Sequence, residues 1–283
     1  MKGMHMTGLH KKLLAAFSAF ILFVMLMTGA QAADRASVEA FLKTTGFDVA
    51  IDSITLSAEN APAMLGLEDA EFGNEWTYVA RRVFDSGFMQ NRAIGILEAT
   101  LEDDVLIHAA AFYASDLGKR LVDAENTSHF EDDDMKNERG REIVAGLVAD
   151  GSERLGLIKR MNHAIDPNDV GPEAVQEIQV RFILAASYAG VIELSVDEEG
   201  LRAALKESEG ELRREMEASA LANAAYTYRA FSDDDLRAYA EALEEPDMQT
   251  VYELMNAVHF EVMMNRFEAL AVELADVQPS QEL

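Results

Sequence analysis

Apolar residues recur at three- and four-residue spacing along almost the whole chain after Ser37, and alternation of single apolar and polar residues is hard to find. Such spacing lines up apolar side chains on one face of an α-helix. Residues that favour helices dominate the chain. The prolines stand between the periodic segments, at Pro62, Pro167, Pro172, Pro246 and Pro279. We therefore predict an all-α fold, a multi-helix bundle.

Interruptions of the pattern set the bounds of the expected helices. A first helix near residues 37–56 should break or bend around Gly46, and a loop that contains Pro62 and Gly73 should follow. Helices are next expected over residues 76–100 and 103–114, and then from the cap Ser115 through the string NTSHFE. Two shorter helices should follow, one that ends at about residue 150 and one that ends at about residue 164. The last four are expected over about 172–194, 197–230, 232–243 and 246–276, and the third of these should begin with a capping box of Ser232 and Asp235.

The string NTSHFE returns 130 positions later as NAVHFE. Residues 101–131, placed on residues 231–261 without gaps, match at eight of 31 positions, and Asp116 falls opposite Pro246, so the helix breaks coincide too. The repeat predicts two similar helical units in tandem. Its shared signature is Asn126, His129, Phe130 and Glu131 in one copy and Asn256, His259, Phe260 and Glu261 in the other.

This organisation divides the chain into four parts. They are a signal peptide over residues 1–32, a first helical unit over 33–131, a helical connection over 132–165 and a second helical unit over 166–283.

The first part has the pattern of a secretory leader. Lys11 and Lys12 precede the apolar run of residues 13–27, and a small-x-small site ends at Ala32. An uncleaved membrane anchor would need about 20 apolar residues, and this run is shorter. We therefore expect a periplasmic or secreted protein with no stable membrane insertion after signal cleavage. The chain has no cysteine, so packing alone must stabilise it.

The net charge of the chain limits the kinds of binding partner that we expect. The chain after residue 32 holds 21 basic and 51 acidic residues, a net charge of −30. A field of this sign repels phosphate backbones, so nucleic acid is not expected as a partner. An unknown protein or peptide partner is expected instead, although an acidic surface also serves solubility alone.

The repeated histidines allow two interpretations. On a helix, residues three apart share a face and residues two apart do not, so Asn126 can touch His129, whereas His129 and Glu131 cannot grip one metal ion. The functional interpretation makes His129 and His259 general acid–base groups or ligand hooks. We prefer the structural interpretation, in which each Asn/His pair docks a helix in the interior. Both rings in one open cavity together with an acid would contradict it.

Metal and cofactor sites find little support. Tyr252, Met255 and Met263 around His259 are not matched in the first copy, which has Val122 and Glu125 at the first two equivalent positions, so core filling explains them better than a haem or copper site. No cofactor is therefore expected.

One loop resembles a calcium-binding loop. Asp166, Asn168 and Glu177 stand at loop positions 1, 3 and 12 of an EF-hand, but Val170 takes a position that needs an oxygen ligand. A capped turn that opens the next helix is the preferred interpretation of this loop.

No Gly-x-Ser-x-Gly, His-Glu-x-x-His, phosphate-loop or dinucleotide motif occurs. The stretch FYASDLGKRL, however, resembles the signature of domain-of-unknown-function family 2059, over about residues 77–131 and more faintly 218–276. The matching residues are Phe112, Tyr113, Ser115, Leu117 and Gly118, with Asp116 where Pro is usual. In the second copy Pro246 keeps that place, while Glu245 and Met248 replace Ser and Gly. The resemblance implies an exported, all-helical bacterial protein and supplies no catalytic residue.

We therefore expect a non-enzymatic binding or interaction protein of the cell envelope. One alternative is a small hydrolase or metal-dependent enzyme that uses His129 or His259 with nearby carboxylates. Another alternative is a periplasmic chaperone that exposes a groove between the two units.

Overall fold

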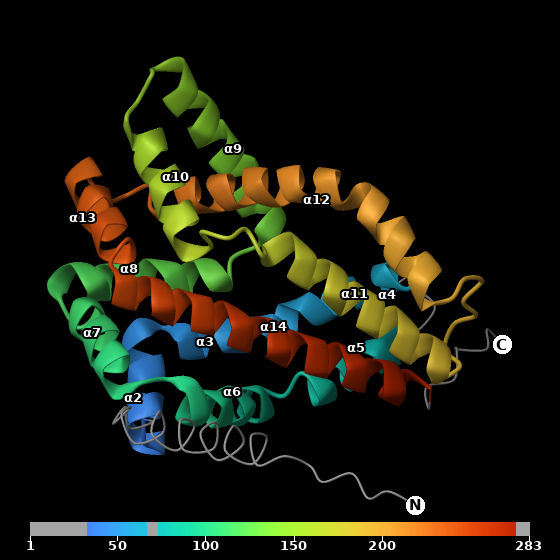
Figure 1. Ribbon diagram of the computed structural model, residues 1–283. Helices are drawn as coiled ribbons and strands as arrows, with labels where there is room; N and C mark the ends of the chain where they lie inside the picture. The colour runs from blue at the N-terminus through green and yellow to red at the C-terminus, as the bar shows by residue number, and fades with distance from the viewer. Residues whose placement is uncertain (1–32, 67–72, 276–283) are drawn as a thin grey trace, which may run out of the picture.

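A computed structural model describes residues 33–66 and 73–275, and every regular element in these ranges is a helix (Figure 1). The elements in chain order are α2 (Arg35–Thr45), α3 (Phe47–Ser53), the 3-10 helix η1 (Ile54–Asn60), α4 (Ala61–Met64), α5 (Gly73–Val83), α6 (Ser86–Thr100), α7 (Asp103–Tyr113), α8 (Asp116–His129), α9 (Asp133–Ala149), α10 (Arg154–Ile165), α11 (Gly171–Tyr188), α12 (Glu198–Thr227), α13 (Asp233–Leu243) and α14 (Pro246–Leu274). The prediction of an all-α fold is confirmed. The expected signal peptide, residues 1–32, lies outside the described residues.

The break near Gly46 occurs where the pattern placed it. Gly46 has φ 77°, a left-handed conformation that costs glycine little, and it separates α2 from α3. A Cβ atom at this position would lie 2.6 Å from Oδ1 of Asn126. Because Asn126 belongs to α8, glycine here also allows α3 to lie against α8.

The single helix expected over residues 76–100 was wrong. The structure has α5 and α6 instead, because Asp85 adopts an extended conformation and its carboxylate accepts the backbone N–H of Phe88 at 2.8 Å. Phe84, just before this cap, is buried and packs edge-on against Phe267 with 5.4 Å between ring centroids. The expected loop was also too long, since Pro62 lies in α4 and Gly73 opens α5.

The expected end of α11 near residue 194 was wrong as well. Helix α11 ends at Tyr188 because Gly190, with φ 78°, turns the chain. The N–H of Val191 then returns to the carbonyl of Ala186 at 2.9 Å and satisfies one end of the helix.

Two predicted caps are confirmed. The hydroxyl of Ser115 accepts the N–H of Gly118 at 3.0 Å at the start of α8. At the start of α13, Ser232 and Asp235 form the full capping box. Helix starts were therefore predictable from short-range chemistry.

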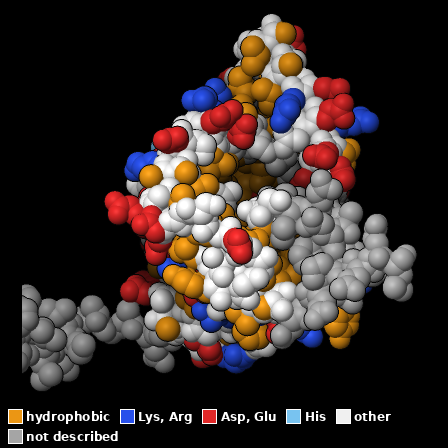
Figure 2. Space-filling model, turned by 90° about the vertical axis from the view of Figure 1, so that its right-hand side faces the viewer, with side chains coloured by type: hydrophobic (Ala, Val, Ile, Leu, Met, Phe, Trp, Pro, Cys, Tyr) orange, Lys and Arg blue, Asp and Glu red, His pale blue; other side chains and the backbone are white. Residues whose placement is uncertain are grey.

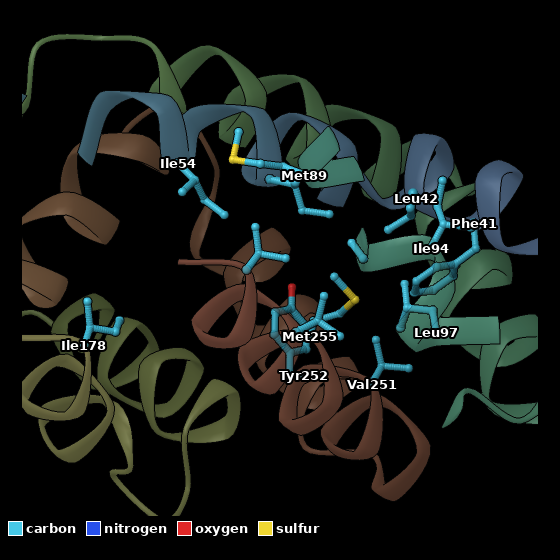
Figure 3. Packing of buried hydrophobic residues seen from close by; sticks show 14 of the residues in the cluster. Phe41, Leu42, Ile54, Met89, Ile94, Leu97, Ile178, Val251, Tyr252 and Met255 are labelled. Carbon is cyan, nitrogen blue, oxygen red and sulfur yellow. The ribbon is translucent and has the colours of Figure 1, made fainter. Parts of the chain in front are cut away.

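Helix α14 crosses the middle of the molecule (Figure 1). It packs against α11 on one side and against α5, α6 and α7 on the other. Val251 and Met255 extend from α14 on the side where Leu97 of α6 lies (Figure 3), and the ring of Tyr252 packs against Phe47 of α3. One hydrophobic core results, and it runs from Ala33 to Leu274. Of the described helices, none is long and apolar enough to cross a membrane.

The helix bounds follow the sequence repeat. Helices α7 and α13 each have 11 residues, and their starts, like the starts of α8 and α14, are 130 positions apart. The copies then diverge, since α8 has 14 residues and α14 has 29. The tandem units over residues 33–131 and 166–283, joined by 132–165, stay a prediction.

Acidic side chains are spread over the surface, as the net charge of −27 requires. Figure 2 shows one face with several Asp and Glu side chains, in which hydrophobic side chains form the floor of a hollow. Charged side chains of both signs stand around the rim of this hollow.

Candidate functional site

A cavity of about 520 Å³ lies among α3, α8, α12 and α14. Its lining combines hydrophobic side chains with amides, hydroxyls, two imidazoles and one carboxyl group. This size and mixture are typical of small-molecule sites. The polar lining residues are Thr45, Glu125, Asn126, Ser128, His129, Lys136, Asn162, Asn223, Thr227, Tyr228, Tyr239, Tyr252, Asn256 and His259.

Both copies of the repeated Asn/His pair contribute to this one cavity. Asn126 and His129 lie one turn apart at the end of α8, and Asn256 and His259 lie one turn apart in the middle of α14. The three-residue spacing puts each pair on one face of its helix, as the sequence predicts. Helix packing then directs the two faces toward the same space.

Some of these side chains are already held by neighbours. The amide of Asn256 donates to the carbonyl of Ile165 at 3.0 Å, which ties α14 to the end of α10. Nδ1 of His129 lies 3.4 Å from the hydroxyl of Ser53, with the proton's position set by the ring tautomer. Within the described part of the chain, no hydrogen bond to His259 is formed.

A carboxyl group that the sequence did not single out as a site residue lines the same cavity as the imidazoles. Oε1 of Glu125, on α8, accepts the hydroxyls of Tyr228 at 2.7 Å and Tyr239 at 2.9 Å. The hydroxyl of Tyr239 also lies 3.1 Å from the hydroxyls of both Tyr113 and Tyr252. Glu125 of α8 therefore bonds Tyr228, which follows α12, and Tyr239 of α13, and through Tyr239 it is linked to α7 and α14.

Burial shifts the proton affinity of these groups. Burial raises the pKa of Glu125 to about 7, against the hydrogen bonds from Tyr228 and Tyr239, which lower it. Burial and the neighbouring His129 lower the pKa of His259 to about 4. Burial, aided by the charge of Lys136, lowers the pKa of His129. Near neutral pH the cavity therefore holds two uncharged imidazoles and a carboxyl group that readily changes its charge.

The other signature residues point elsewhere. Phe130 is 59% exposed. Glu131 accepts the hydroxyl of Tyr226 at 3.4 Å, and Glu261 pairs with Arg92. Each Glu is thus engaged away from the neighbouring imidazole, in agreement with the two-residue spacing argument. Among the described residues, no three His, Asp or Glu side chains are grouped closely enough to hold a metal ion.

The three residues of the EF-hand-like loop are not brought together. Asp166 accepts the N–H groups of Val170 at 3.0 Å and Gly171 at 3.1 Å, so its carboxylate caps the start of α11. Glu177, in α11, pairs instead with Arg202 and Arg181, and the hydrogen bonds from these two side chains lower its pKa. Asn168 is exposed in the turn.

Fold and site together define an all-helical protein in which a cavity of mixed polarity lies between the Asn/His pairs of α8 and α14. Residues 88–145 match the family described as "Uncharacterized protein conserved in bacteria (DUF2059)". The match confirms the resemblance seen in the sequence, and it covers α7, α8 and most of α6 and α9, including Glu125 and His129. No curated protein and no solved structure matches the chain.

Proposed function

We propose that this chain is an exported binding protein whose ligand occupies the cavity among α3, α8, α12 and α14. The observation that carries the proposal is that His129 and His259, from the two copies of the repeat, line this single cavity with Glu125. Export is supported by the leader pattern of residues 1–32.

The polar groups of the cavity are set up for a ligand. Oδ1 of Asn223 is buried and has no hydrogen-bond partner among the described residues. Leaving a buried acceptor unpaired costs about 1–3 kcal/mol, so natural proteins rarely keep one without a reason. Because almost none of Oδ1 is accessible from the cavity, a ligand donor would reach it only if the side chain of Asn223 turned. The ring of His259 lines the cavity and makes no hydrogen bond within the described chain, so a ligand can bond to it directly.

The interior interpretation of the histidines now has less support. A ring that only joins two helices is expected to bond to its neighbour. His259 instead lines open space, and it shares that space with His129 and an acid. This arrangement is the one that the sequence argument named as contradicting a purely structural role.

Catalysis is the second candidate function, because a carboxyl group with a pKa of about 7 suits proton transfer at neutral pH. Binding is favoured over catalysis for a geometric reason. In the described residues, no hydrogen bond joins Glu125 to either imidazole, and the only hydroxyl bonded to His129, that of Ser53, lies 3.4 Å away and also donates to the carbonyl of Ala50. A nucleophile and base need a closer, oriented contact.

The test starts from the protein purified from its native compartment. Native mass spectrometry of the wild-type chain should reveal a bound small molecule, and a thermal-shift screen of a metabolite library should find compounds that raise the melting temperature. The double variant His129→Ala with His259→Ala should lose both effects. His108→Ala is the matched control, since this ring lies outside the cavity, 3.9 Å from Asp247, and its side chain is 37% exposed.

Three outcomes separate the candidates. Loss of the ligand from the double variant but not from the control supports binding. A library compound that is converted to a product by the wild type alone supports catalysis. The binding proposal is wrong if no compound is retained or stabilises the wild type, and a lower melting temperature of the double variant in that case restores the structural role.

A further inference from the structure

We infer that the cavity selects an organic cation, an amine with an apolar body, whose ammonium group binds at Glu125. This inference rests on the proposed function, because it names the ligand class of the same cavity. It stands on three features of the lining: its charges, its hydrogen-bond acceptors and its aromatic walls.

The charges of the lining leave room for a cation and none for an anion. Glu125 is the single acidic residue among those that line the cavity, and Lys136 is the single Lys or Arg. Nζ of Lys136 already donates to the carbonyl of Ser128 at 2.7 Å and pairs with Asp133 at 2.7 Å. An anionic ligand would therefore meet Glu125 without a free cation to compensate, which is costly in a buried site.

The carboxyl group of Glu125 keeps an acceptor for a ligand. Its Oε1 accepts two hydroxyl groups, no hydrogen bond to its Oε2 occurs in the described chain, and the carboxyl remains partly ionised near pH 7. Each neutral imidazole adds one acceptor nitrogen beside its N–H donor. An ammonium group has three N–H donors and no acceptor, so it can pair with the carboxylate and with these nitrogens.

Aromatic side chains form part of the cavity wall. Phe47, Tyr252 and Phe260 line the cavity together with Met255. The rings of Phe47 and Tyr252 pack edge to face, with 5.5 Å between centroids. Such walls bury a hydrocarbon body, and the faces of aromatic rings attract cations. The net charge of −27 adds a field that draws cations toward the protein.

Three matched probes test the inference: 2-phenylethylamine, 2-phenylethanol and 3-phenylpropanoate share a ring and a short chain but differ in the charge of the head group. Isothermal titration at pH 7.5 should show the amine binding about tenfold more tightly than the alcohol, and the carboxylate binding most weakly. Glu125→Gln keeps an oxygen that accepts from Tyr228 and Tyr239 but removes the charge. It should lower the affinity for the amine to that for the alcohol.

Glu131→Gln is the matched control, since it removes one negative charge a short distance along the chain and outside the cavity. This variant should bind all three probes as the wild type does. Circular dichroism and retained binding of the alcohol show that Glu125→Gln is folded.

The possible failures can be told apart. The amine inference is overturned if the alcohol or the carboxylate binds as tightly as the amine, or if Glu125→Gln leaves the preference for the amine intact. In these cases a ligand site exists and the proposed function stands. It is also overturned if none of the three probes binds, and the proposed function then falls only if the native mass spectrometry and the library screen are negative too.

Discussion

The buried carboxyl group of Glu125 should make the free energy of unfolding of the protein depend on pH. Burial raises its pKa from 4.5 to about 7 in the folded chain. Well below pH 4.5 the carboxyl group is protonated in both states and does not affect the free energy of unfolding. As the pH rises from 4.5 to 7, the unfolded chain loses the proton before the folded chain does, so the folded state becomes progressively less stable. Glu125→Gln cannot ionise and should escape this loss.

The two pKa values set the size of the effect. Linkage between 4.5 and about 7 gives a penalty of about 1 kcal/mol at pH 5 and about 3 kcal/mol at pH 8. The free energy of unfolding of Glu125→Gln, relative to the wild type, should therefore rise by about 2 kcal/mol between pH 5 and pH 8. A constant offset from the new amide group does not affect this rise. The titratable groups around Glu125 are Tyr113, His129, Lys136, Tyr228, Tyr239, Tyr252 and His259. Because both proteins contain these groups, their own titration largely cancels in the difference.

Urea unfolding followed by circular dichroism at pH 5, 6, 7 and 8 measures this difference. The free energy of unfolding should fall with urea concentration at the same slope in both proteins, because equal slopes indicate the same unfolding reaction. Glu131→Gln shows what the loss of one negative charge does by itself in a chain of net charge −27. A difference that stays flat from pH 5 to pH 8, or that shrinks, would refute the buried state of Glu125.

The remaining predictions concern packing, capping and the ligand. Gly140→Ala should lower the free energy of unfolding by about 3 kcal/mol, because its Cβ would lie 2.1 Å from the carbonyl oxygen of Ala222, where α9 and α12 cross. Gly146→Ala on the same helix, with nothing within 4 Å, should instead raise it by about 0.5–1 kcal/mol, and urea unfolding of both variants checks the contrast. Ser232→Ala should lower the stability by about 1 kcal/mol in thermal melts through loss of the capping box of α13. The affinity for 2-phenylethylamine should rise about tenfold from pH 6 to pH 8 as Glu125 ionises, and an affinity equal at both pH values in titration calorimetry would contradict this.

The sequence was enough to predict the all-α fold class, most helix starts and the break at Gly46, because the causes of these features are local. A hydroxyl or carboxylate caps a helix through atoms three residues away, as Ser115 does, and a glycine turns the chain at its own position. The cap at Asp85 was missed because the helical spacing of apolar residues continues across it. Phe84, the residue before this cap, is buried against Phe267, and no local pattern reports a contact between residues so far apart in the chain.

The site was predictable only in part, for the same reason. The repeat pointed to Asn126, His129 and their counterparts, and the spacing rule set which side chains share a face. No pattern along the chain indicates that the two faces meet. The bonds from Glu125 to Tyr228 and Tyr239 join residues 103 and 114 positions apart, a separation at which no local pattern reports a contact.

The origin of the cavity walls has a consequence for biosynthesis. One wall comes from α8 and another from α14, whose histidines are 130 positions apart. A nascent chain cannot enclose the cavity until α14 has been made and has settled across the earlier helices. Binding of a ligand would therefore stabilise only the complete chain, and it would not stabilise chains that are still being synthesised.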